Sequence, residues 1–158
     1  MIRVETSDGQ IHQVARADAD MIGYLKQVEQ GSAEAFPISN VDSVTLLKVL
    51  SFCQLLKHVG KASVNMGVDE MKSFVAIEAV REWCESNCNT TEARMQLSEA
   101  ASFLDFPTLM YCCFQLIADS YCSMSLPEMR KFFGLPASPS ITQEEIDQFN
   151  ATSATLFE

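Results

Sequence analysis

The side chains best suited to nucleophilic or metal chemistry in this sequence belong to six cysteines and two histidines. Cys84 and Cys88 would share one face of a helix, but two thiolates without two further ligands do not make a structural zinc site. Catalysis needs a nucleophile, a base and an orienting group in one place. His12 falls in a predicted hairpin and His58 at the end of a predicted buried helix. We therefore predict that the protein is not an enzyme and holds no metal.

Motifs for other cofactors are missing from the sequence. The segment Asp18-Ala19-Asp20 lacks the glycine and the terminal glutamate of a calcium loop, and no glycine-rich phosphate loop occurs. The cysteines form no CxxC pair, so we expect small buried hydrophobes rather than a disulfide framework. No cofactor is predicted.

The charge and the apolar runs exclude two classes of partner. Lys and Arg number 11 against 21 Asp and Glu, and a net charge of -10 repels phosphate backbones. The longest mainly apolar run, residues 106–118, is shorter than the roughly 20 residues that span a bilayer. The N-terminus lacks the basic and apolar regions of a signal peptide. We expect no nucleic acid, no membrane, and a cytoplasmic and nuclear location.

The first third of the chain predicts a small sheet. With 158 residues, of which 47% are hydrophobic, the chain can bury an ordinary core. Alternating residues at 2–6 and 11–14 flank an Asp-Gly turn and predict a β-hairpin. Apolar residues at helical spacing predict one helix from Asp18 to just before Gly31. Residues 36–38, with a central proline, predict a short edge strand.

The rest of the chain predicts helices. Asp42 is placed to cap a nearly all-apolar helix, which should be the buried centre. A loop at 60–67 precedes a further helix, and the later helices begin at a proline or at capping boxes. These helices are expected at Glu70 to Cys84, at Thr91 to Leu104 after Asn89-x-x-Glu92, at Pro107 to Tyr121, after Ser125-x-x-Glu128, and after Thr142-x-x-Glu145. Strands first and helices afterwards indicate the α+β class.

The last third carries more apolar side chains than its short helices can bury against one another. The apolar area that remains uncovered either completes a single core or forms a binding surface, and the residues alone favour these two interpretations equally. Helix-in-groove recognition is the binding mode expected of such a surface. The side chains concerned are Met110, Phe114, Ile117, Tyr121, Met129, Phe132, Phe133, Leu135, Ile146 and Phe149.

Four blocks of the sequence resemble the Skp family (S-phase kinase-associated protein) in their order and spacing. They are residues 2–10 (IRVETSDGQ), 36–43 (FPISNVDS), 97–105 (LSEAASFLD) and 125–135 (SLPEMRKFFGL). The resemblance implies a BTB/POZ fold, a small sheet flanked by helices, over residues 1–122. It also implies a C-terminal helical extension over residues 123–158 that completes an F-box-binding surface.

The resemblance implies a non-catalytic adaptor that links F-box substrate receptors to a cullin scaffold in an SCF-type E3 ubiquitin ligase. The F-box surface falls at Leu97, Met110, Phe114, Ile117, Tyr121, Met129, Phe132, Phe133 and Leu135, and the cullin surface at Asn40, Val41, Ser102 and Phe103. Without an F-box partner, the exposed apolar area is expected to drive homodimer formation. The alternatives are an F-box-binding subunit of a non-ligase assembly, such as a kinetochore complex, and a thiol enzyme that uses Cys84 or Cys88.

Three departures from the family pattern define this chain. Ser102-Phe103 stands where the family has Asn-Tyr, and the tail at 154–158 lacks the usual Asn-Gln-Trp. The segment at 60–84 is richer in apolar residues than in acids, whereas the family has an acidic, flexible loop, so we predict an ordered helix over Glu70 to Cys84.

Overall fold

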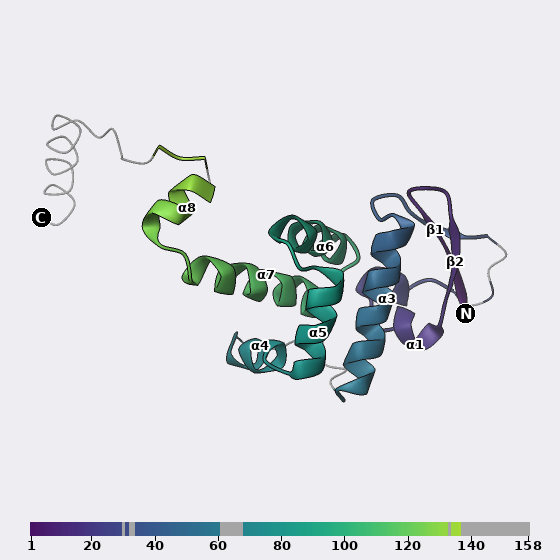
Figure 1. Ribbon diagram of the computed structural model, residues 1–158. Helices are drawn as coiled ribbons and strands as arrows, with labels where there is room; N and C mark the ends of the chain where they lie inside the picture. The colour runs from purple at the N-terminus through teal and green to yellow at the C-terminus, as the bar shows by residue number, and fades with distance from the viewer. Residues whose placement is uncertain (30, 32–33, 61–67, 133, 137–158) are drawn as a thin grey trace, which may run out of the picture. The chain divides into compact units, whose positions relative to one another are not determined.

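The computed structural model describes residues 1–29, 31, 34–60, 68–132 and 134–136 (Figure 1). The chain divides into two compact units, residues 1–119 and 120–158. Unit 1 joins a three-stranded sheet to helices. The predicted α+β class is confirmed, and its elements follow the order of a BTB/POZ-like Skp fold. The domain boundary proposed after residue 122 stays a prediction.

The sheet has the order β2-β1-β3, with β1 (Ile2–Thr6) in the centre. β2 (Ile11–Val14) pairs with β1 antiparallel, and β3 (Phe36–Ile38) pairs with β1 parallel. Side chains at alternate positions of β1 are buried, which is the pattern of a sheet with one face on the core. Gly9 closes the hairpin turn at a φ of 76°, a region that glycine adopts without steric cost. The hairpin and the proline-bearing edge strand are confirmed.

The single helix predicted from Asp18 is wrong, because the chain forms two short helices, α1 (Arg16–Ala19) and α2 (Gly23–Lys26). At the break, the backbone N–H of Gly23 donates to the carbonyl of Asp105 (3.0 Å), and the N–H of Tyr24 donates to that of Leu104 (3.0 Å). A Cβ at residue 23 would overlap the Asp105 side chain. The carbonyl groups of Leu104 and Asp105 therefore accept from the two N–H groups that a continuous helix would use for its own hydrogen bonds.

The central helix is α3 (Ser43–His58), as predicted. The Asp42 carboxylate accepts from the backbone N–H of Thr45 (2.7 Å) and caps its N-terminus. α3 packs against α1, α5 and α6 (Figure 1). Its Phe52 ring is fully buried and lies edge-on to the rings of Phe74, Trp83 and Phe106.

The apolar segment after α3 is ordered and packed, as predicted, but it forms two helices rather than one. These are α4 (Val68–Val75) and α5 (Glu78–Asn87). Ile77 has an extended backbone between them, so the continuous helix over 70–84 is wrong in its middle. Both helices bury apolar side chains, namely Met71, Phe74, Val75, Val80 and Cys84. Of the predicted loop, residues 61–67 lie outside the described part of the chain.

The later helices lie close to their predicted positions. They are α6 (Thr91–Phe103), α7 (Pro107–Cys122) and α8 (Leu126–Phe132). The Thr90 hydroxyl, not Asn89, caps α6 by accepting from the N–H of Ala93 (3.1 Å). Among the described residues, no helix combines the length and apolarity needed to cross a membrane. The Thr142-x-x-Glu145 box, Ile146, Phe149 and the tail lie outside the described residues.

Candidate protein-interaction surfaces

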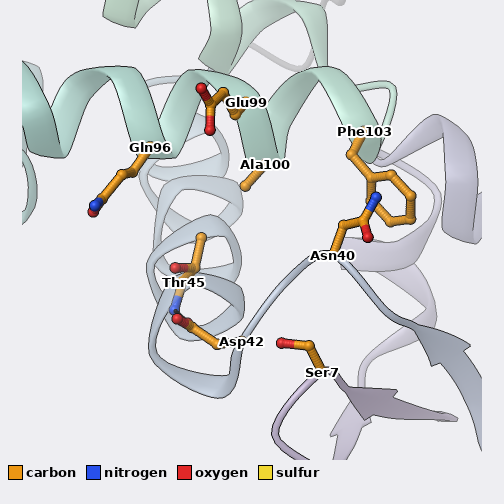
Figure 2. Close-up of a pocket in the computed structure, with 8 residues that line it drawn as sticks. All are labelled: Ser7, Asn40, Asp42, Thr45, Gln96, Glu99, Ala100 and Phe103. Atoms are coloured by element: carbon orange, nitrogen blue, oxygen red, sulfur yellow. Dashed lines mark hydrogen bonds between the residues drawn. The ribbon is translucent and has the colours of Figure 1, made fainter.

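A pocket of about 460 Å³ opens in unit 1 between α6 and the loop that leads into α3 (Figure 2). α6 contributes residues one turn apart, and the loop and the hairpin turn contribute short polar side chains. The lining residues are Ser7, Asn40, Asp42, Thr45, Gln96, Glu99, Ala100 and Phe103. The pocket is therefore mainly polar, with one aromatic ring at its edge.

Hydrogen bonds fix the loop that forms the floor of this pocket. The N–H of Ser7 donates to the carbonyl of Val41 (2.9 Å), which ties the loop to the hairpin. Asp8 beside it accepts from the hydroxyl of Thr6, and this bond lowers the pKa of the Asp8 carboxyl below its ordinary value. With the Asp42 cap on α3, these contacts hold the surface in one shape.

The residues assigned to the cullin surface divide between the surface and the core. Asn40 and Phe103 both line the pocket, and Ser102 is exposed beside Phe103. Val41 is 1% exposed, so its side chain belongs to the core and cannot supply the expected surface contact. Val41 follows the exposed residue Asn40 directly, and the sequence pattern around it does not indicate that its side chain is buried.

Phe103 is half-buried and already has an aromatic neighbour. Its ring centroid lies 5.0 Å from that of Tyr24, and Tyr24 lies 5.4 Å from Phe36. One part of the Phe103 ring therefore completes this aromatic cluster, and the remainder lines the pocket.

The predicted site residues include two of the eight that line this pocket, Asn40 and Phe103, and they omit Ser7, Asp42, Thr45, Gln96, Glu99 and Ala100. Gln96, Glu99 and Phe103 follow one another at helical spacing along α6, and this periodicity marks a single helix face. That signal was present in the sequence. The contribution of Ser7 and Thr45 depends on the tertiary fold and left no local pattern.

Four residues assigned to the F-box surface lie in unit 1. Leu97 on α6 is 2% exposed and belongs to the core, which contradicts its assignment to a surface. Met110 and Ile117 on α7 are half-buried, whereas Phe114 is 47% exposed. Of the four, Phe114 offers the most aromatic area to a partner.

The remaining F-box residues lie in unit 2. The ring of Tyr121 lies 5.4 Å from that of Phe132 in an edge-on arrangement, and Met129 is half-buried. Phe132 and Leu135 are exposed, and no residue of α8 is buried. Phe133 lies outside the described residues. Unit 2 thus presents apolar side chains on a short helix.

The end of α8 is well defined. Gly134 has a φ of 64°, and the N–H of Leu135 donates to the carbonyl of Arg130 (2.8 Å). This is the pattern of a helix that ends at a glycine in the left-handed region. It places the exposed side chain of Leu135 just beyond the helix.

The histidine nearest to a hydroxyl is arranged for structure rather than catalysis. His12 Nε2 lies 2.6 Å from the Ser43 hydroxyl, which donates to the Gln10 side chain (3.2 Å). Ser43 is buried, so this contact joins β2 to the start of α3 inside the domain. In the described part of the chain, no three His, Cys, Asp or Glu side chains are grouped so as to hold a metal ion.

Comparison with known proteins gives relatives along nearly the whole chain, although no family model matches. The E3 ubiquitin ligase complex SCF subunit sconC of Arthroderma otae is 27% identical over 151 residues, covering 93% of this chain and 88% of the relative. SKP1-like protein 11 of Arabidopsis thaliana is 26% identical over 148 residues, covering 92% and 90%. SCF ubiquitin ligase complex protein SKP1a of Dictyostelium discoideum is 24% identical over 152 residues, covering 94% and 90%.

The chain is similar to Skp proteins over most of its length, which supports a divergent member of the Skp family. Relatives from a fungus, a plant and an amoeba match the same long stretch, so the likeness does not rest on one short motif. The family resemblance predicted from the four sequence blocks is confirmed. The polar pocket and the aromatic side chains of α7 and α8 are the candidate interaction surfaces of this chain.

Proposed function

We propose that this protein is a non-catalytic adaptor that links F-box substrate receptors to a cullin scaffold in an SCF-type E3 ubiquitin ligase. The observation that carries the proposal is similarity over 92–94% of the chain to proteins whose names describe SCF subunits. An adaptor needs two surfaces held by one stable core, and it needs no nucleophile or cofactor. We place its action in the cytoplasm and nucleus.

The proposed F-box surface consists of the apolar side chains on α7 and α8. Phe114 and Phe132 are aromatic and are 47% and 42% exposed, and aromatic side chains are frequent anchors at interfaces. Met110, Ile117, Tyr121 and Met129 are half-buried beside them on the same helices. When no F-box partner is bound, the exposed apolar area favours a homodimer.

The proposed cullin surface consists of Asn40, Ser102, Phe103 and the pocket that Asn40 and Phe103 line. The pocket side of the Phe103 ring can still bury apolar area, and such burial is worth about 25 cal/mol per Å². The hydroxyl that the family has at this position would add only about 0.5–1.5 kcal/mol as one net hydrogen bond. Cullin binding should therefore persist but be weaker than in the family.

One observation favours a second candidate, a Skp-like F-box-binding subunit of a non-ligase assembly without cullin. Part of the Phe103 ring is already used by Tyr24, and Val41 is in the core. Fewer side chains remain free for a cullin, whereas the exposed aromatic residues on α7 and α8 are unaffected. This candidate keeps the F-box surface and drops the cullin surface.

Affinity purification of the tagged full chain, followed by mass spectrometry, separates the candidates. An F-box protein together with a cullin supports the ligase adaptor, and an F-box protein alone supports the second candidate. Recovery of neither partner would contradict both.

Binding of an F-box protein and of a cullin N-terminal region is then measured side by side. Phe103→Ala should abolish cullin binding and leave F-box binding unchanged, with Ser102→Ala as the matched milder change. Since Phe103 also contacts Tyr24, the fluorescence of Trp83 is recorded to verify that unit 1 remains folded.

A further inference from the structure

The pocket between α6 and the loop before α3 carries negative charge and no positive charge. Glu99 and Asp42 contribute one carboxylate each from opposite sides (Figure 2). The described residues that line the pocket include no lysine, arginine or histidine. The net charge of the whole chain is -10, so its overall field has the same sign. The pocket therefore attracts a cation and repels an anion.

Glu99 is the stronger cation acceptor of the two carboxylates. It is exposed, and no hydrogen bond or ion pair joins its carboxylate to another described residue. It lies just before the last turn of α6, and the C-terminal end of a helix favours positive charge. Asp42, in contrast, already accepts from the N–H of Thr45 (2.7 Å) at the N-terminus of α3. A bound cation would therefore make its main contact with Glu99.

The rest of the lining suits a flat cation with several donors. Asn40 and Gln96 are exposed amides, and their oxygens accept hydrogen bonds. The Phe103 ring packs on Tyr24 with 5.0 Å between the ring centroids, and it also lines the pocket. A guanidinium stacks on an aromatic ring and donates in its own plane, whereas a lysine ammonium is a compact point charge. A volume of about 460 Å³ leaves room for a whole arginine side chain.

A metal ion fits this pocket less well than a guanidinium does. In the described part of the chain, no three His, Cys, Asp or Glu side chains are grouped so as to hold a metal ion. Ca²⁺ takes about six to eight oxygen ligands at short range. The two carboxylates lie on opposite sides of the pocket, and that of Asp42 caps a helix. Donors spread over a plane match these separated acceptors better than a single ion does.

We propose that this pocket binds an arginine side chain that the cullin supplies. Its guanidinium pairs with Glu99, stacks on the pocket side of Phe103 and donates to an amide oxygen of Asn40 or Gln96. The contact offsets in part the loss of Val41, whose buried side chain is not available to a partner. The cullin as the source of the arginine rests on the proposed function, whereas the preference for a guanidinium rests on the pocket alone.

The first measurement tests the pocket without a cullin. The isotope-labelled full chain is titrated at constant ionic strength with N-acetyl-arginine amide, and its backbone amide signals are followed by NMR. We expect shifts at Asn40, Glu99 and Phe103 with a dissociation constant on the order of millimolar, as for one side chain in an open pocket. N-acetyl-citrulline amide, which has a similar shape but no charge, should shift none of these signals. N-acetyl-lysine amide should shift them less than the arginine probe.

A pair of variants on α6 tests the assigned carboxylate. Glu99→Gln should weaken binding of the arginine probe about three- to tenfold, because the amide keeps the shape but loses the charge. Glu92→Gln is the matched control, since it removes the same charge from the first turn of α6 outside the pocket, and it should change binding little. Both side chains are exposed, so neither change should disturb folding.

The second measurement uses the N-terminal region of a cullin that is recovered with the chain. Glu99→Gln should weaken its binding about three- to tenfold, and Glu92→Gln should not. The difference between Glu99→Gln and the unmutated chain should shrink as the salt concentration is raised.

Three results would overturn the inference. These are no shift at the pocket with the arginine probe, equal shifts with the lysine or citrulline probe, and equal cullin binding by Glu99→Gln and the unmutated chain. A failure of the proposed function looks different. If the unmutated chain binds no cullin while the arginine probe still binds the pocket, the cullin is overturned as the source and the preference for arginine stands.

Discussion

The two units of this chain differ in how they cover their apolar side chains. In unit 1, residues from Ile2 to Cys113 share one buried cluster, with Phe52 at the contact of three other aromatic rings. The described residues of unit 2 contribute nothing to that cluster, and its aromatic pair, Tyr121 and Phe132, remains partly exposed. Unit 1 is therefore stabilised by its own core, whereas the apolar residues of unit 2 are available to a partner.

The largest expected effect is the loss of the central ring of unit 1. Phe52→Ala should lower the free energy of unfolding by about 3–5 kcal/mol, because it removes a fully buried ring and leaves a cavity among three others. Urea unfolding followed through Trp83, the single tryptophan and a neighbour of Phe52, measures the change. Phe132→Ala deletes the same ring from unit 2 and should cost about 1 kcal/mol or less. Equal losses in the free energy of unfolding for the two variants would contradict the view that only unit 1 depends on a buried aromatic core.

The second effect is on binding rather than on folding. Phe132→Ala should weaken association with a co-purified F-box protein by about 2 kcal/mol or more, roughly 30-fold, as expected of an aromatic anchor. Titration calorimetry measures the change. Ile11→Ala on β2 is the control, since Ile11 is also an exposed apolar side chain but lies in the hairpin. If both variants bind like the unmutated chain, the exposed ring of α8 has been assigned the wrong role.

Local sequence signals predicted the elements, and long-range contacts decided where the predictions failed. The hairpin turn, the Asp42 cap and the helix starting at Pro107 depend on a few adjacent residues, and all three were predicted. The break at Gly23 depends on carbonyls of Leu104 and Asp105, about 80 residues later, which no local pattern contains.

The proposed interaction surfaces follow from the positions of family motifs, which carry no information on the exposure of each side chain. Aligned motifs identify which residues correspond to a family's surface, yet whether a side chain reaches solvent depends on packing in this chain. Val41 and Leu97 are both apolar, and both are buried. Gln96 and Glu99 are polar and line the pocket, but the family resemblance assigned neither of them to a surface, although Glu99 lies within the matching block at 97–105.

A smaller effect tests the cap of α6 in unit 1. Thr90→Ala should destabilise unit 1 by about 1 kcal/mol, because the Ala93 N–H loses its acceptor at the first turn. Asn89→Ala, one residue earlier, should change stability by less than about 0.5 kcal/mol. The urea unfolding midpoints of the two variants provide the comparison. A larger loss of stability for Asn89→Ala than for Thr90→Ala would indicate that Asn89 is the capping residue, as the sequence predicted.

The smallest effect concerns the corresponding helix start in unit 2. The Glu128 carboxylate accepts from the backbone N–H of Ser125 (2.8 Å) and from its hydroxyl (2.6 Å), and these bonds lower the pKa of Glu128 below its ordinary value of 4.5. Because the pKa is lower in the folded helix than in the unfolded chain, the ionised group favours the folded helix. This contribution is complete above the unfolded value and is lost as the pH falls through the folded value.

Acidification should therefore loosen the start of α8. Amide protection factors at Ser125, each taken relative to the intrinsic exchange rate at the same pH, should fall when the pH is lowered below about 4.5. Glu128→Gln should start with less protection and lose this dependence, since an amide keeps the shape but not the charge. Asp8, whose pKa is also lowered, titrates near the hairpin of unit 1, so residue-level readings separate the two sites. Equal pH dependence at Ser125 in the variant and the unmutated chain would mean that Glu128 does not hold this helix start.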